Sequence, residues 1–180
     1  MTEGAAEKAI FDALLDRNLL KFDRTEILSE KVNKCRNIKE HGFIHTDILS
    51  LPKTEEITII RVMDKDTPFA KLPKNIAKRP ISHEIILTKP EIEILHIIAD
   101  GNVEHYLQNS SGTKPSEYLS SYNKKYEKSE KYWKSFLSII DDSKLISILE
   151  KYEVKRKQTH KPNESSFYDY LKDPESFKEE

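Results

Sequence analysis

A run of apolar and β-branched residues from Ile57 to Met63 leads directly into two aspartates, Asp64 and Asp66. Six of the seven residues in this run are apolar or β-branched, which is typical of a strand covered on both faces. Side chains two positions apart in a strand point the same way, so Asp64 and Asp66 can converge just past the strand end. Because two close carboxylates repel each other unless a cation or proton lies between them, the pattern predicts a magnesium site there.

The composition limits what else the chain can be. Its 180 residues suffice for one domain with a helical appendage, and 30 basic residues nearly balance 31 acidic ones, so net charge argues neither for nor against a nucleic-acid partner. The single cysteine, Cys35, excludes an internal disulfide and suits a reducing compartment. No apolar run is long enough to span a bilayer, and no signal pattern is present, so we expect a cytoplasmic protein without membrane attachment.

The first hundred residues alternate between helical and strand patterns. This order predicts an α/β fold with a mostly parallel sheet flanked by helices. Helices are expected over 4–18, 30–49 and 91–100, strands over 25–28, 57–63 and 81–88, and a loop over 66–80.

Beyond Gly101 the pattern becomes helical, with windows over 115–126, 130–140 and 143–152. We therefore divide the chain into an α/β domain (1–101), a helical C-terminal extension (102–154) and a polar, partly disordered tail (155–180). Within the tail the aromatic segment 167–171 is expected to dock as a single turn.

Two stretches of basic residues bear on nucleic-acid binding. The first follows the predicted strand end and contains Lys65, Lys71, Lys74, Lys78 and Arg79, which can steer or clamp a phosphate backbone. The second, 114–134, combines six lysines with Tyr118, Tyr122, Tyr126, Tyr132 and Trp133. Such a surface can stack single-stranded bases, but the same spacing arises when a helix buries its tyrosines, and we favour that second interpretation.

Three motifs together resemble the Toprim domain of topoisomerases, primases and OLD-type nucleases. They are Glu3-Gly4-x-x-Glu7 opening a helix, the buried strand ending in Asp64-x-Asp66, and a strand running into Lys89-Pro90-Glu91-Ile92-Glu93. The resemblance covers about residues 1–100 and is closest to the small RloB-like Toprim proteins of bacterial defence and mobile elements.

The resemblance implies a function and a set of site residues. It implies a magnesium-dependent nuclease that acts on DNA or RNA and works with a partner subunit of a defence system. Glu3 takes the role of the family's catalytic glutamate, Asp64 and Asp66 bind Mg²⁺, and Glu7 and Glu91 are further candidate ligands. The family has a strand before its Glu-Gly turn, whereas only Met1 and Thr2 precede it here. We therefore expect that first strand to be missing or to lie upstream of Met1.

Each motif also has a purely structural interpretation. Acids after a strand are common in solvated turns, and Glu3, Glu7 and Glu91 would favour the positive ends of their helices without any ligand. A decayed Toprim-like module that binds nucleic acid or a partner protein without cleaving anything is therefore the alternative function.

Overall fold

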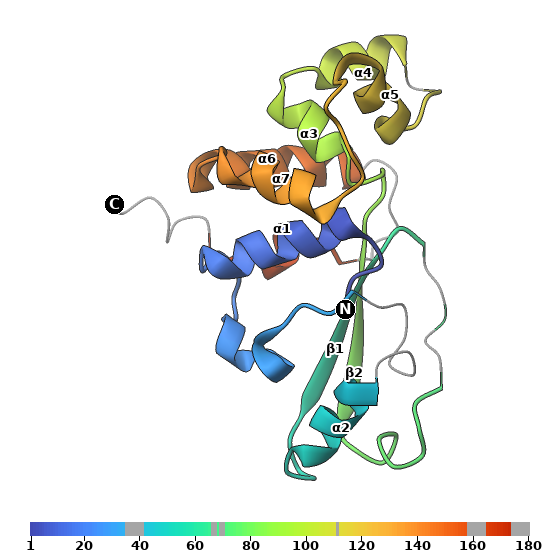
Figure 1. The fold of residues 1–180 in the computed structure, drawn as a ribbon, viewed down its shortest axis with the longest axis vertical. Helices are drawn as coiled ribbons and strands as arrows, with labels where there is room; N and C mark the ends of the chain where they lie inside the picture. The colour runs from blue at the N-terminus through green and yellow to red at the C-terminus, as the bar shows by residue number, and fades with distance from the viewer. Residues whose placement is uncertain (35–41, 66–67, 69–70, 111, 158–164, 174–180) are drawn as a thin grey trace.

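The computed structural model describes residues 1–34, 42–65, 68, 71–110, 112–157 and 165–173, and Figure 1 shows their arrangement. The described part is an α/β fold. Its strands are β1 (Ile57–Met63) and β2 (Ile81–Leu87). Its α-helices are α1 (Ala5–Asp16), α2 (Gly42–Ser50), α3 (Ile94–Ala99), α4 (Val103–Asn109), α5 (Pro115–Tyr122), α6 (Glu130–Ser138) and α7 (Asp142–Lys157).

The two strands pair in parallel, with Ile57 opposite Ile81 and Met63 opposite Leu87. Both were predicted from their apolar, β-branched runs, and β1 begins and ends at the predicted residues. Because the strands are parallel and in register, Asp64 and Thr88 leave the sheet at the same end, where both strands have their carboxyl ends. Thr88 ties the two strand ends together, since its backbone N–H and its hydroxyl both donate to the carbonyl of Met63, at 2.8 and 3.0 Å.

Short segments extend this sheet at both edges. Thr2 forms parallel bridges with Val62 of β1 and with Lys34, and Ser165 forms one with Ile86 of β2. The N–H of Glu3 donates to the carbonyl of Val62 at 3.0 Å. The chain before the Glu-Gly turn, where the resemblance to Toprim domains led us to expect no strand, therefore lies beside β1 as a short extended segment.

Side chains from the two faces of β1 enter two different cores. Val62 belongs to the main core, which includes residues of α1, α3, α6 and α7 as well as Phe167 and Leu171. Ile59 faces a smaller core with Ile48 of α2 and Ile76 of the following loop. Coverage on both faces explains why the strand lacks a simple alternation of polar and apolar residues.

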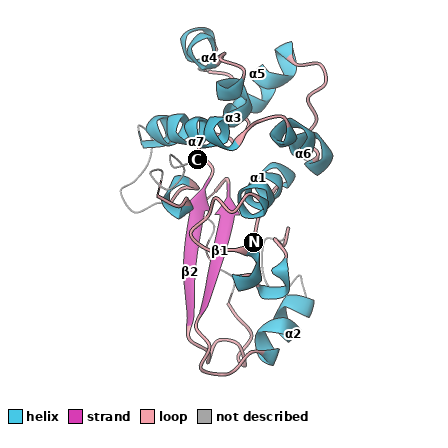
Figure 2. Ribbon diagram, turned by 90° about the vertical axis from the view of Figure 1, so that its left-hand side faces the viewer, coloured by secondary structure: helices cyan, strands magenta, loops and turns pink. Residues whose placement is uncertain are grey.

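Most of the helices gather beyond the carboxyl ends of the strands. Figure 2 shows both strand arrows pointing towards α1, α3 and α7, while α2 lies near the opposite end. Helix α1 packs against α6, and α3 packs against α5 and α7. The predicted helical windows of the C-terminal half correspond to α5, α6 and α7, and the aromatic segment docks through buried Phe167 before a 3-10 turn, Tyr168–Tyr170.

Three predicted elements are wrong in part. Residues 24–26 form a 3-10 turn and not a strand, because Asp23 and Glu26 cap each other's backbone N–H groups in a capping box. Of the helix predicted over 30–49, residues 42–49 belong to α2, and residues 35–41 lie outside the described residues. Residues 31–34 are not helical, and the carbonyl of residue 33 accepts a hydrogen bond from Thr2. The helix predicted from residue 91 begins at Ile94, after a turn that follows a cis Lys89–Pro90 peptide bond.

Within the described ranges, no helix is both long and apolar enough to cross a bilayer.

Candidate functional site

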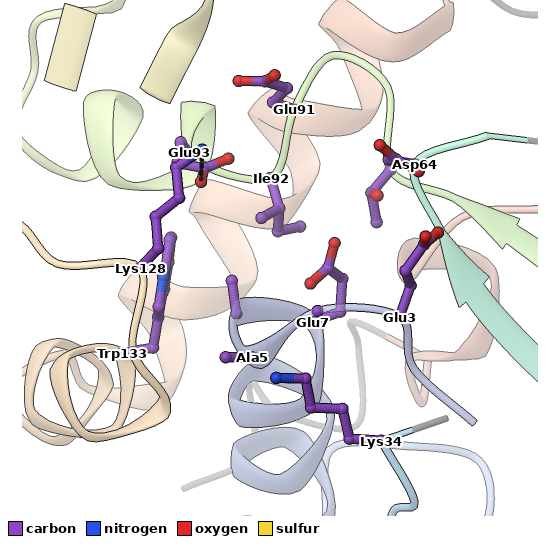
Figure 3. Close-up of a pocket in the computed structure, with 13 residues that line it drawn as sticks. Glu3, Ala5, Glu7, Lys34, Asp64, Glu91, Ile92, Glu93, Lys128 and Trp133 are labelled. Carbon is purple, nitrogen blue, oxygen red and sulfur yellow. Dashed lines mark ion pairs between the residues drawn. The ribbon is translucent and has the colours of Figure 1, made fainter. Parts of the chain in front are cut away.

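A cavity of about 380 Å³ lies at the carboxyl ends of the strands, where the sheet meets α1 and the start of α3 (Figure 3). Each of the segments that leave the sheet here contributes to it: Glu3 follows Thr2, Asp64 follows β1, and Thr88 follows β2. In open α/β sheets, ligands usually bind at the carboxyl ends of the strands. Five carboxylates line the cavity, from Glu3, Glu7, Asp64, Glu91 and Glu93.

The fold thus brings together acids that are distant in the sequence. Glu3 and Glu7 were proposed from one motif, Asp64 and Glu91 from two others, and all four line this one cavity. Asp66, the second member of the predicted aspartate pair, lies outside the described residues. The structure therefore supports a common location for the four described acids and leaves the role of each as a prediction.

Glu7 has the most unusual environment of these acids. It lies in the first turn of α1, with only 7% of its surface exposed. Burial raises the pKa of its carboxyl group, its own backbone N–H partly opposes this, and the negative charges of Glu93, Asp64 and Glu3 raise it further. A Cβ at Gly4 would overlap Oε2 of Glu7, so glycine is needed for this side chain to fold back over the turn.

Glu91 and Glu93 already have protein partners. The carboxylate of Glu91 accepts a hydrogen bond from the backbone N–H of Ser116 in the first turn of α5, at 3.3 Å. Glu93, which is 7% exposed, accepts one from the hydroxyl of Tyr126 at 2.6 Å and lies 3.8 Å from the ammonium of Lys128. These contacts give both acids a structural role in attaching the C-terminal helices to the start of α3.

The donor set suits Mg²⁺ only in part. Among the described residues, no three His, Cys, Asp or Glu side chains are grouped closely enough to hold one ion. Mg²⁺ commonly takes only one or two carboxylates and keeps water or substrate phosphate in its other positions. Asp64 and Glu3, which lie together on one side of the cavity in Figure 3, fit that sparse kind of coordination.

The basic residues predicted to clamp phosphate are placed differently. Lys65 directly follows Asp64, so it lies at the same end of the sheet as the acidic cavity. Arg79 lies two residues before β2, at the other end of the sheet, and its guanidinium donates to the carbonyls of Leu49, Leu51 and Pro52 at 2.9 to 3.0 Å. These contacts give Arg79 a structural role at the end of α2, and its role in phosphate binding stays a prediction.

Lys71 and Lys74 belong to the same loop as Arg79. Lys74 lies in the turn in which the N–H of Ile76 donates to the carbonyl of Pro73, and Ile76 packs in the small core near the start of β1. This loop leads into the amino end of β2, so the structure does not bring Lys74 to the acids. Lys71 precedes this turn on the same loop and does not line the cavity.

Sequence reasoning missed three cavity residues: Lys34, Lys128 and Trp133. Lys34 was assigned to a helix, and the other two belonged to the aromatic stretch interpreted as helix packing. The tyrosines are only half-buried, and Tyr122 is exposed, but each of their hydroxyl groups has a side-chain partner. The partners are His105 for Tyr118, Asp100 for Tyr122, Glu93 for Tyr126 and His96 for Tyr132.

We compared the chain with protein-family models, with curated proteins and with solved structures, and none of them matches it. The resemblance to Toprim domains therefore stays a prediction that depends on the three motifs and their common location.

The raised pKa of Glu7 predicts a specific pH dependence of stability. A folded-state pKa above the unfolded value means that the folded state binds the proton more tightly, so stability falls as pH rises from the unfolded towards the folded pKa. We expect Glu7→Gln, which cannot ionise, to melt at a higher temperature than the wild type at pH 7–8 in EDTA, and the two to converge towards pH 4. Thermal melts across this range measure the difference.

Glu117→Gln is the matched control, because Glu117 occupies the first turn of α5 but is exposed. This variant should melt at or slightly below the wild-type temperature, since it loses only a favourable helix-end charge. A Glu7→Gln protein less stable than the wild type at pH 8 would contradict the environment described for Glu7.

Proposed function

We propose that this chain is a magnesium-dependent nuclease that cleaves nucleic-acid phosphodiesters at the cavity beyond β1 and β2. The observation that carries the proposal is the convergence of Glu3 and Glu7, at the start of α1, with Asp64, after β1, at the end of the sheet where α/β proteins bind ligands. The setting in bacterial defence or a mobile element, with a partner subunit, depends on the Toprim resemblance alone.

The carboxylates can divide the chemistry between them. Asp64, exposed just after β1, and Glu3 would hold Mg²⁺. When bound, the ion supplies charge that polarises a phosphoryl oxygen. Glu3 would also orient a water molecule and accept its proton as a P–O bond forms.

Glu7 suits the donation of a proton to the leaving oxygen. Its raised pKa means that it keeps a proton more readily than an ordinary glutamate, so it can give that proton to the leaving oxygen as the other P–O bond breaks. Two carboxyl groups with different environments in one cavity thus provide a base and an acid. The step balances, because Glu3 takes one proton from water and Glu7 gives one to the leaving oxygen.

The test is cleavage by the wild-type protein. Single-stranded DNA, double-stranded DNA and RNA are each incubated with the chain in Mg²⁺, in Ca²⁺ and in EDTA, and products are resolved on a denaturing gel. We expect cleavage of at least one substrate in Mg²⁺ and none in EDTA. Cleavage that persists in EDTA, or its absence in every arm, would refute a magnesium-dependent nuclease.

One observation favours the alternative, a binding module without activity. Glu91 and Glu93 have structural partners, and no three described acids form a ready ion site. This module would bind nucleic acid in a gel-shift assay with equal affinity in Mg²⁺ and EDTA, and would leave the substrate intact.

A further inference from the structure

Trp133 is the only tryptophan of the chain, and its indole N–H is buried without a hydrogen-bond partner among the described residues. The side chain is 1% exposed, on α6, where that helix packs against α1. Buried donors in folded proteins are nearly always paired, because an unpaired one loses its hydrogen bond to water. Trp133 also lines the acidic cavity, so a bound ligand is the natural acceptor.

Other donors lie on the same side of the cavity. Figure 3 shows Trp133, Lys128 and Ala5 on the side away from Asp64 and Glu3. Ala5 begins α1, a helix of 12 residues whose first backbone N–H groups have no acceptor within the helix and whose amino end carries positive potential. An indole N–H, a lysine and a helix amino end form a set of donors that suits an anion.

Two acids lie near these donors: Glu7, whose side chain folds back over the amino end of α1, and Glu93, whose charge is already engaged. Glu93 accepts the hydroxyl of Tyr126 and lies 3.8 Å from Lys128, the contact drawn as a dashed line in Figure 3. Lys128 has 68% of its side chain exposed, so it can turn from Glu93 towards a ligand. The two sides of the cavity therefore differ: carboxylates that suit a cation face donors that suit an anion.

We infer that Trp133, Lys128 and the amino end of α1 form a subsite for a phosphate group of the nucleic-acid substrate, in which the indole N–H donates to a phosphate oxygen. The inference depends on the proposed function, because only that function identifies the ligand as a nucleic acid. It adds that a phosphate group of this ligand lies at Trp133, away from the acids that would hold Mg²⁺. Trp133 acts in it as a binding residue.

The indole N–H provides its own readout, because a chain with one tryptophan gives one indole resonance in a ¹⁵N-correlation spectrum. The full chain is titrated with inorganic phosphate, with the thymidine dinucleotide TpT, and with thymidine as the phosphate-free control, each with and without Ca²⁺. We expect TpT to move the resonance downfield and to slow its exchange with water, and thymidine to do neither. An equal response to thymidine, or no response to TpT, would overturn the inference.

Two variants test how strongly Trp133 and Lys128 contribute to the binding of TpT. Trp133→Phe keeps an aromatic ring and removes the N–H, and we expect TpT to bind about tenfold to a hundredfold more weakly, the usual effect of losing a hydrogen bond to a charged group. Lys128→Met should weaken binding in the same direction and cannot disturb the core, since Lys128 is exposed. It keeps the inference falsifiable should Trp133→Phe fail to fold.

Leu137→Ala is the matched control, because Leu137 is a buried residue of the same helix that does not line the cavity. It loses packing but keeps the donor, so TpT should bind it as it binds the wild type. Binding lost equally in Leu137→Ala and Trp133→Phe would show that only packing matters.

The two proposals fail separately. If wild type and Trp133→Phe bind TpT equally while the wild type cleaves nucleic acid in Mg²⁺, the phosphate subsite is wrong and the nuclease stands. If TpT moves the indole resonance while no substrate is ever cleaved, the subsite stands and the nuclease is wrong.

Discussion

Asp64→Asn is expected to lower magnesium-dependent cleavage by about a hundredfold or more while leaving the protein as stable as the wild type. An amide has nearly the shape of a carboxylate but carries no charge, so the variant loses its hold on the cation without losing volume. Asp64 is exposed and raises the pKa of Glu7 through its charge. Removing that charge relieves a repulsion, and the melting temperature should stay unchanged or rise.

Glu56→Gln is the control for this variant, since Glu56 is exposed and immediately precedes β1, at the opposite end of the same strand. Its cleavage rate should match the wild type. Initial rates on the substrate cleaved by the wild type, measured over a range of Mg²⁺ concentrations, report the effect. Equal rates for Asp64→Asn and Glu56→Gln would remove Asp64 from the site.

The sequence predicted the parts of the fold that depend on local patterns. Six of the seven residues of the run 57–63 are apolar or β-branched, and such a run has few alternatives to a strand once helices cover both faces. The acids at its end could be assigned to a shared site, because parallel strands place their carboxyl ends together. Asp64 follows from this topology, whereas Glu3 and Glu7 were assigned from the Toprim resemblance alone.

The errors arise where tertiary contacts decide the local structure. Val32, Cys35 and Ile38 have the apolar spacing of a helix, but the carbonyl of Asn33 accepts a hydrogen bond from Thr2 and Lys34 forms a bridge with Thr2, so the backbone is extended there. The strand expected over 25–28 could have been avoided, since Asp23 and Glu26 have the spacing of a capping box.

The cavity residues that were missed show the same limit. Lys128 and Trp133 belong to a stretch 60 or more residues from Asp64 in the chain, and no local pattern shows that α6 packs against α1. Arg79 was assigned to phosphate binding from its charge alone, whereas three backbone carbonyls at the end of α2 hold its guanidinium. Charge identifies what a side chain can bind, and the fold decides what lies within its reach.

The largest effect on stability is expected at a buried ion pair of α7. Arg156 and Glu153 are 3% and 5% exposed, and Nε of the arginine donates to Oε2 of the glutamate at 2.9 Å. The guanidinium also donates to the carbonyl of Ser165 at 3.2 Å, and Ser165 pairs with Ile86 of β2. This arginine thus connects the last helix to the segment that extends the sheet.

We expect Arg156→Leu to lower the free energy of unfolding by about 3–5 kcal/mol, because the variant leaves the Glu153 carboxylate buried with its principal partner gone. Denaturant unfolding at pH 7, followed by far-UV circular dichroism, gives this value. Lys151→Ala, an exposed change on the same helix, should stay within about 0.5 kcal/mol of the wild type.

The double variant Glu153→Leu/Arg156→Leu separates the cost of an unpaired charge from the value of the pair itself. Replacing both partners of a buried ion pair with apolar residues is often neutral or stabilising, since neither charge then has to be removed from water. We therefore expect the double variant to recover most of the stability that Arg156→Leu loses. Should both proteins be destabilised equally, the contact between Arg156 and Ser165, and not the buried charge of Glu153, would be what holds this end of α7 to the sheet.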